Sequence, residues 1–432
     1  MRRKTMQVNT GYPLAVLYLC CAAAQANDIK TTLSASSMFS DNSLKTLEEP
    51  IDERQDLYEV GVSADYSNWL IEANADYDWV SHTYSEQSQA DDKYAEGSSS
   101  LLFGKQEDPL ALELNHSRRI LLTAPDAVAL TQNQQEREVI SARPEARARI
   151  FAADRLFIGG EFTRVNFPEN DLQNSQRDGI ALGWLHPLSA ASFLRLNSQQ
   201  QKISFEHFPE SDYTYSGAML VYGVELRKLT YGVEVGYNES EPENGESKGA
   251  PSYRISASYL SGFNQLDFSA SRVLTDNSFG NGNLEGTTGL PASDGLSQAV
   301  SRIDRNTAEL NWQTQVVCAR CQFSTGVSAI EDDYLEKDES SLSIYKRARF
   351  VYSFSRAANL SLSYASADVD FDNQSVTRDY ELNTISIEYA YFFSNGLNAR
   401  FSARNEDRKA EGENGNGTYE ENIYSIGLGY SF

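Results

Sequence analysis

The chain has 432 residues and a formal net charge of −24, with 61 acidic against 37 basic side chains. Negative charge opposes contact with phosphate backbones, so no nucleic-acid partner is expected. Beyond its first segment the sequence has no apolar run long enough for a transmembrane helix.

The first 26 residues have the composition of a secretory signal peptide. A basic start (Arg2, Arg3 and Lys4) precedes a mostly apolar stretch over 12–24 and an A-x-A cleavage pattern at 24–26. We therefore predict cleavage after residue 26, with loss of the two cysteines at 20 and 21. The remaining residues, 27–432, are predicted to form a single domain, because the span before the first strand is too short for a plug or a separate module.

Apolar and polar residues alternate along the whole mature chain. Two clear examples cover 229–237 and 253–259, and further ones lie at 308–316 and 397–403. Strict alternation is the signal of a strand with one oily and one polar face. The pattern predicts about 20 strands (18–20), each long enough to cross a membrane at a tilt.

The connections between these strands alternate in length. Tight links alternate with long polar loops, which we place at 41–55, 83–92, 121–134, 168–177, 240–250, 275–301, 332–340, 371–378 and 406–417. Short periplasmic turns and long outer loops are typical of bacterial outer-membrane barrels. The loops are rich in acids, for example over 331–339. Such runs are usually solvated surface, although they could share divalent cations with lipopolysaccharide.

The last predicted strand is the most specific. Large apolar residues occupy every second position, at Tyr424, Ile426, Leu428, Tyr430 and Phe432, with small or polar residues between them. A strand in a barrel wall alternates in this way because its side chains face lipid and lumen in turn. The segment resembles the C-terminal signal read by the barrel-assembly machinery. The predicted fold is thus an all-β transmembrane antiparallel barrel in the bacterial outer membrane, with lipid, lipopolysaccharide, periplasmic chaperones and the assembly machinery as partners.

Arginines recur at the polar positions of the alternating strands, and we expect these positions to line the lumen. An arginine ladder can guide anionic solutes. Alternatively, these arginines pair with inward acids and fill the lumen; Glu113 and Arg147 are candidates for such a pair. The candidate pore-lining residues are Arg143, Glu145, Arg147, Arg149, Arg195, Arg254, Arg347, Arg349, Arg400 and Arg404.

Other chemistry is weakly represented. Cys318 and Cys321 bracket a two-residue turn, which favours a hairpin disulfide or an inert pair over a redox or metal site. His82, near Ser81 and Asp78, is the one weak candidate for a hydrolase at the barrel rim. No catalytic residue, metal site or cofactor is predicted.

Short motifs in the N-terminal third suggest a relationship. They are Ser40-Asp41-Asn42 at the end of the opening strand and the S-A-x-P-x-x-R segment that begins at Ser141. The chain resembles the outer-membrane β-barrel proteins of exosortase/PEP-CTERM exopolysaccharide loci. This resemblance implies a role in polysaccharide production or secretion, with export components as partners. It would also place Arg143 and Arg147 on the segment that marks the family.

The function expected from the sequence is therefore a pore or conduit, for export of exopolysaccharide or diffusion of anionic solutes. The alternative is a structural or surface-interaction barrel whose lumen is closed by its own salt bridges. A rim hydrolase that uses His82 is the least favoured alternative.

Overall fold

The computed structural model describes residues 28–105, 108–123, 126–151, 153–276, 278, 301–316, 318–336, 339–373, 378–411 and 417–432. The predicted signal peptide, 1–26, lies outside these residues, as does most of the predicted loop 275–301. Across the described residues, no helix is both long and apolar enough to cross a membrane.

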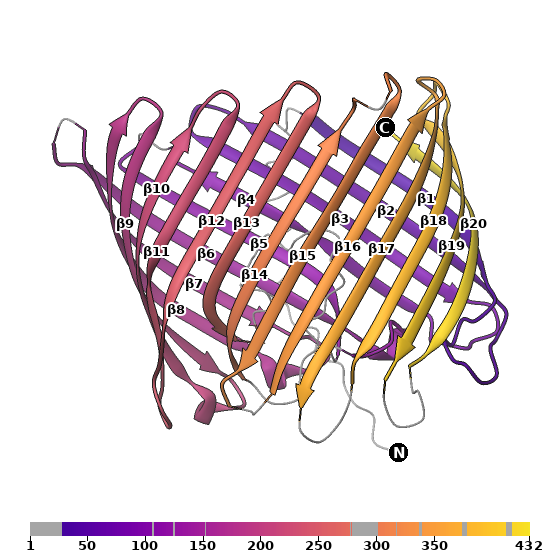
Figure 1. Ribbon diagram of the computed structural model, residues 1–432, viewed down its shortest axis with the longest axis horizontal. Helices are drawn as coiled ribbons and strands as arrows, with labels where there is room; N and C mark the ends of the chain where they lie inside the picture. The colour runs from indigo at the N-terminus through magenta and orange to yellow at the C-terminus, as the bar shows by residue number, and fades with distance from the viewer. Residues whose placement is uncertain are drawn as a thin grey trace, which may run out of the picture.

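The protein is a closed antiparallel barrel of 20 strands, which confirms the predicted fold class (Figure 1). The strands are β1 (Asp28–Ser40), β2 (Glu53–Ser67), β3 (Ile71–Tyr84), β4 (Asp92–Phe103), β5 (Leu110–Leu122), β6 (Gln134–Arg149), β7 (Arg155–Asn166), β8 (Ser175–Ser189), β9 (Ser192–Phe205), β10 (Tyr213–Glu225), β11 (Leu229–Pro242), β12 (Lys248–Ser261), β13 (Asn264–Asp276), β14 (Arg302–Thr314), β15 (Cys321–Tyr334), β16 (Glu339–Ser353), β17 (Ala358–Asn373), β18 (Tyr380–Phe392), β19 (Leu397–Ala410) and β20 (Tyr419–Ser431). Short 3₁₀ turns lie at η1 (Thr131–Asn133), η2 (Asp171–Gln173) and η3 (Pro209–Ser211).

Pairing of the first and last strands closes the sheet. β1 pairs with β2 on one edge and with β20 on the other, where Thr32 lies opposite Ser431 and Phe39 opposite Tyr424. This closure leaves none of the described strands with a free edge, which a barrel needs wherever the surrounding medium cannot accept hydrogen bonds.

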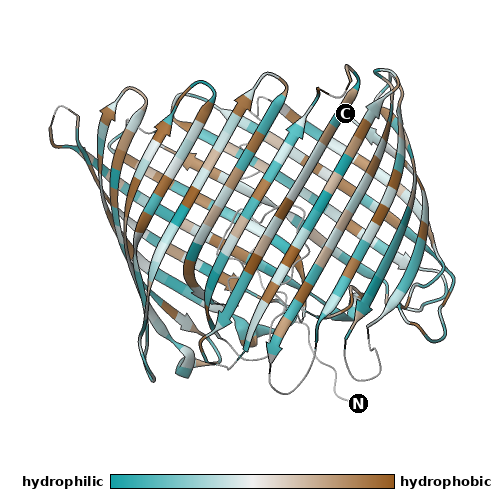
Figure 2. Cartoon of the chain, in the orientation of Figure 1, coloured by the Kyte–Doolittle hydropathy of each residue, from teal (hydrophilic) through white to brown (hydrophobic). Residues whose placement is uncertain are grey.

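Alternation assigns the two faces of the wall. On β20, Tyr424, Ile426 and Leu428 are 60%, 48% and 56% exposed, as expected for side chains on the outer surface. Apolar and polar positions alternate in the same way along the other strands (Figure 2). The residues between the oily positions therefore point into the lumen.

The strands extend further toward the long-loop end than the sequence pattern indicates. β15 and β19 run into segments predicted as loops. Their last residues continue the hydrogen-bonded ladder but are polar on both faces, so the sequence there lacks the alternation that marks a strand. The loop between β9 and β10, which carries η3, was not predicted. β8 continues through Pro187 to Ser189 with an irregular register.

Deleting Phe432 is expected to weaken the closing seam. The backbone N–H of Phe432 donates to the carbonyl of Thr31 at 3.0 Å, and the Thr31 N–H donates back at 2.9 Å. Loss of both bonds should lower the free energy of unfolding in urea by about 2 kcal/mol. Phe432→Leu keeps the backbone bonds and serves as the control. Equal stability of the deletion and the parent would show that these bonds do not hold the seam.

Candidate functional site: the lumen and its mouth at the long-loop end

The inward face of β6 carries three of the predicted arginines, Arg143, Arg147 and Arg149. The Nη2 atom of Arg143 lies 3.0 Å from Glu161 Oε1 on β7. Arg147 donates to Glu145 on its own strand. Arg149, nearer the end of the strand, is exposed. Acids on β6 and β7 therefore neutralise part of the arginine charge along this strand.

The expected pair between Glu113 and Arg147 does not form. In the β5–β6 register Glu113 lies opposite Arg143, and Arg147 bonds through its backbone to Pro109 at the strand end. Glu113 instead accepts a hydrogen bond from Asn115 at 2.8 Å. The strand register, which alternation alone does not set, decides these partners.

The remaining predicted arginines also occupy inward positions. Arg400 is exposed and has no ion-pair partner among the described residues. The others contact polar groups: Arg195 Nε donates to Asn197 at 2.8 Å, Arg254 lies 3.9 Å from Glu234, Arg347 lies 2.9 Å from Glu309, Arg349 donates to Ser361 at 2.9 Å, and Arg404 lies 3.8 Å from Glu406.

Charge is unevenly distributed around the lumen. Along one register row that crosses β6 to β12 lie Arg149, Arg155, Arg195 and Arg254, with Glu234 among them. The inward faces of β2 to β5 carry mostly acids, with Arg119 on β5 as an exception: Glu59, Asp65, Glu72, Asp76, Asp78, Glu96 and Glu113. This separation sets up an electric field across the lumen, and such a field orients and selects charged solutes.

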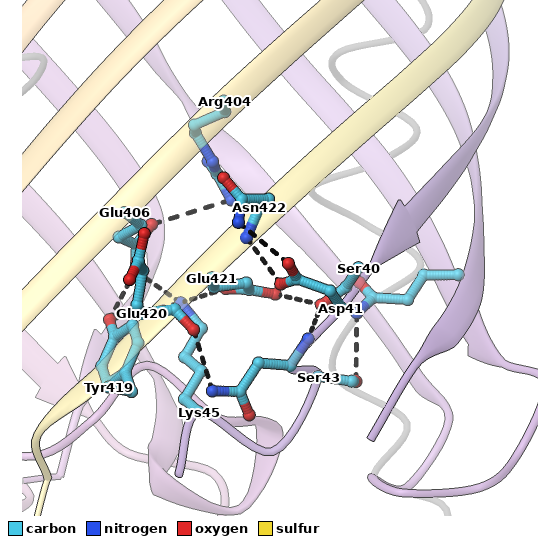
Figure 3. A network of polar contacts seen from close by, with 12 residues as sticks. Ser40, Asp41, Ser43, Lys45, Arg404, Glu406, Tyr419, Glu420, Glu421 and Asn422 are labelled. Atoms are coloured by element: carbon cyan, nitrogen blue, oxygen red, sulfur yellow. Dashed lines mark hydrogen bonds and ion pairs between the residues drawn. The ribbon is translucent and has the colours of Figure 1, made fainter. Parts of the chain in front are cut away.

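Loop 1 (41–52) is anchored to the inward face of the wall at the long-loop end of the barrel (Figure 3). Lys45 Nζ lies 2.6 Å from Glu406 Oε1 on β19 and 3.3 Å from Glu421 Oε2 on β20. The hydroxyl of Tyr419 donates to Glu406 at 2.5 Å. The side chain of Lys45 is only 10% exposed, so its charge is neutralised within the protein rather than by water.

Loops 2 (85–91) and 3 (123–133) are tied to loop 1. Glu53 accepts hydrogen bonds from the Ser43 hydroxyl at 2.6 Å and from the Glu86 backbone at 2.7 Å. Gln89 donates to the Ser43 carbonyl at 2.7 Å and accepts from the Thr131 backbone at 2.8 Å. Loops 1, 2 and 3 therefore form one hydrogen-bonded unit, which we call the loop assembly.

The loop assembly connects the β5–β6 side of the mouth to β18 and β19. Arg408 Nη2 on β19 donates to the carbonyl of Asp126 in loop 3 at 2.6 Å. Arg378, just before β18, lies 3.8 Å from the Asp126 carboxylate. Loop 3 connects β5 to β6, several strands away from β19 on the other side of the β1–β20 seam, so these contacts span part of the mouth.

A second segment folds inward at the same end of the barrel. The end of β13 places Asp276, which has no exposed surface, 2.8 Å from Arg177 Nη2 on β8. The hydroxyl of Tyr213 on β10 donates to the same carboxylate at 2.5 Å, and that of Ser278 donates at 2.6 Å. These partners lie several strands apart around the barrel, so β13 must lean inward to reach them.

Sequence reasoning did not identify this mouth. It treated the acidic segments as solvated surface, yet Asp332 is 2.6 Å from Arg305 and both side chains are buried. Glu336 likewise lies 2.5 Å from Arg302. One feature of the sequence could have indicated the mouth. At the strand ends nearest the long loops the alternation of apolar and polar residues breaks down, and both faces carry charged or aromatic residues.

The histidine and cysteine candidates make local contacts. The Nε2 atom of His82 is hydrogen-bonded to Gln55 Oε1 at 3.0 Å, and its Nδ1 atom is hydrogen-bonded to the Tyr84 hydroxyl at 3.2 Å. Ser81 is on the opposite face of β3, so the rim triad is not assembled. Cys318 and Cys321 are joined by a disulfide in the turn before β15, with their Cα atoms 5.0 Å apart. Within the described ranges, no group of three or more potential ligands could hold a metal ion.

Comparison with known proteins yields no family. No protein-family model and no curated protein matches the chain. Among solved structures, OpdK of Pseudomonas aeruginosa with vanillate matches with a TM-score of 0.37 at 12% identity, covering 94% of this chain and 100% of that one. OccK2 (OpdF) of Pseudomonas aeruginosa with glucuronate (TM-score 0.39, 11% identity) covers 94% and 99%, and outer-membrane-expressed OmpT of Vibrio cholerae (0.38, 11%) covers 94% and 97%. At these TM-scores the likenesses carry no argument about what this barrel binds.

Proposed function

We propose that this chain is an outer-membrane pore that conducts anionic hydrophilic solutes. The observation that carries the proposal is the separation of inward charge between an acidic arc on β2–β5 and a row of arginines on β6–β12. The exposed apolar faces of the strands support a membrane location. Lipopolysaccharide and the barrel-assembly machinery are the partners that this location implies.

Export of an exopolysaccharide is the finer part of the proposal. It rests on the resemblance of the segment from Ser141 to Arg147 to the exosortase-associated barrels. Disruption of the gene is expected to reduce secreted polysaccharide while leaving intracellular synthesis intact. Normal secretion would reject this cargo without rejecting the pore.

A barrel that is closed at rest is a second candidate, favoured by the bonds between the loop assembly and Arg408. In this alternative the barrel serves as a scaffold or surface protein unless the assembly moves. Planar-bilayer recording separates the two functions, because a scaffold gives no conductance from a demonstrably folded barrel.

Removing the paired arginines of β6 should change ion selectivity. Arg143→Ala with Arg147→Ala leaves Glu161 and Glu145 uncompensated at the lumen wall. We expect the anion-to-cation permeability ratio, from reversal potentials in a salt gradient, to fall by roughly twofold or more. The matched double variant Glu145→Gln with Glu161→Gln should move the ratio in the opposite direction. Unchanged ratios in both would show that these residues do not line the ion path.

A further inference from the structure

Two aromatic rings lie on the inner wall of the barrel, where polar side chains are the rule. Phe157 on β7 lies opposite Gly183, and Phe193 on β9 lies opposite Gly223. A Cβ atom on Gly183 would come within 1.8 Å of the Phe157 ring, and one on Gly223 within 2.3 Å of the Phe193 ring. Each ring is therefore laid over a glycine of the neighbouring strand and is only half-buried, with surface left toward the lumen.

An arginine contacts the first ring and shares a strand face with the second. Arg195 is two residues from Phe193 on the same face of β9, and its guanidinium carbon is 4.5 Å from the Phe157 ring centroid. Its Nε donates to Asn197 at 2.8 Å, which fixes the side chain. The terminal Nη atoms have no hydrogen-bond partner among the described residues. A stacked and anchored guanidinium with both Nη groups unused is arranged to bind a carboxylate in a bidentate manner.

We propose that Phe157, Arg195 and Phe193 form a subsite for an acidic sugar unit, that is, a pyranose bearing a carboxylate. The carboxylate would bind the Nη atoms of Arg195, and the apolar face of the sugar ring would pack on Phe193. A small inorganic anion would contact only Arg195, and a neutral sugar would contact only the Phe193 ring. Both should therefore bind more weakly than an acidic sugar. The inference rests on the proposed pore function, because it assigns a cargo class to that same lumen.

Calorimetric titration of the detergent-solubilised barrel tests the subsite without requiring an open mouth. The probes are trigalacturonate, maltotriose of the same length but uncharged, and acetate. Trigalacturonate is expected to bind about tenfold or more tightly than either of the others. Phe193→Leu and Arg195→Gln should each weaken trigalacturonate binding by roughly fivefold or more, and Arg195→Lys should give an intermediate loss.

Two further variants separate ligand binding from folding. Gly223→Ala keeps Phe193 and Arg195 but displaces the ring, so it should reproduce the loss in Phe193→Leu. Phe401→Leu makes the same substitution at a position that is 48% exposed on the lipid face, and should leave binding unchanged. Equal binding of trigalacturonate and acetate, or unchanged binding in Phe193→Leu, would overturn the subsite. Anion selectivity in bilayers would still decide the pore function separately.

Discussion

Replacing Arg378 and Arg408 with glutamine is expected to open the mouth at the long-loop end of the barrel. Arg408 holds the Asp126 carbonyl of loop 3 and also donates to the Gly417 carbonyl at 3.2 Å. Its side chain is 3% exposed, so water does not compete for these bonds. Charge-assisted hydrogen bonds contribute about 1.5–3 kcal/mol each, so loss of both arginines should shift the closed–open equilibrium of the loop assembly by more than about tenfold.

Single-channel recording in planar bilayers measures this shift as a higher open probability or a larger unitary conductance. Lys409→Gln is the matched control, because Lys409 also lies on β19 but is 67% exposed and pairs with Asp407 on the outer surface. Asp126→Asn removes only the contact with Arg378 and should have a smaller effect. If the double variant folds and conducts like the parent, the loop assembly does not limit passage.

The second large effect is expected at the buried pair of Arg177 and Asp276. Arg177→Met removes the cation and leaves a carboxylate with no exposed surface. Breaking a buried ion pair from one side costs about 3–5 kcal/mol, and much of that cost is the unpaired charge that remains. Unfolding in urea should show a loss of this order.

A double variant distinguishes the buried charge from simple loss of packing. Arg177→Met with Asp276→Leu removes both charges and should recover a large part of the lost free energy. Lys202→Gln, which removes one partner of an ion pair more than half exposed on both sides, should change stability by less than about 1 kcal/mol. A double variant no more stable than Arg177→Met would mean that the pair does not act through its charges.

The wall of this barrel could be predicted from the sequence, but the mouth could not. Side chains such as Tyr424 and Ile426 must face lipid, and a two-residue period follows directly from that requirement. The contact between Asp126 and Arg408 has no comparable signature, because it joins loop and strand residues far apart in the chain. The same residue types are common in solvated loops.

The register of the strands explains why the observed partners of the lumen residues differ from those expected from the sequence. Alternation places Glu113 and Arg147 on one face, but it does not say which residues lie opposite one another. Pairing of Glu113 opposite Arg143 shifts the ion pairs to Glu161 and Glu145. Likewise, the flat rings over Gly183 and Gly223 follow from register, so the Arg195 cluster appears only once the strands are aligned.

The seam between β1 and β20 also shapes how the chain folds. Thr32 and Ser431 pair although they lie near opposite ends of the sequence, so their contact has a very large sequence separation. Contacts of this kind are slow to form, because a long loop must be ordered before any pairing compensates for the lost entropy. Until then both terminal strands expose unpaired edges, which invite association with other chains. Refolding should therefore be slow and should lose yield as the protein concentration rises.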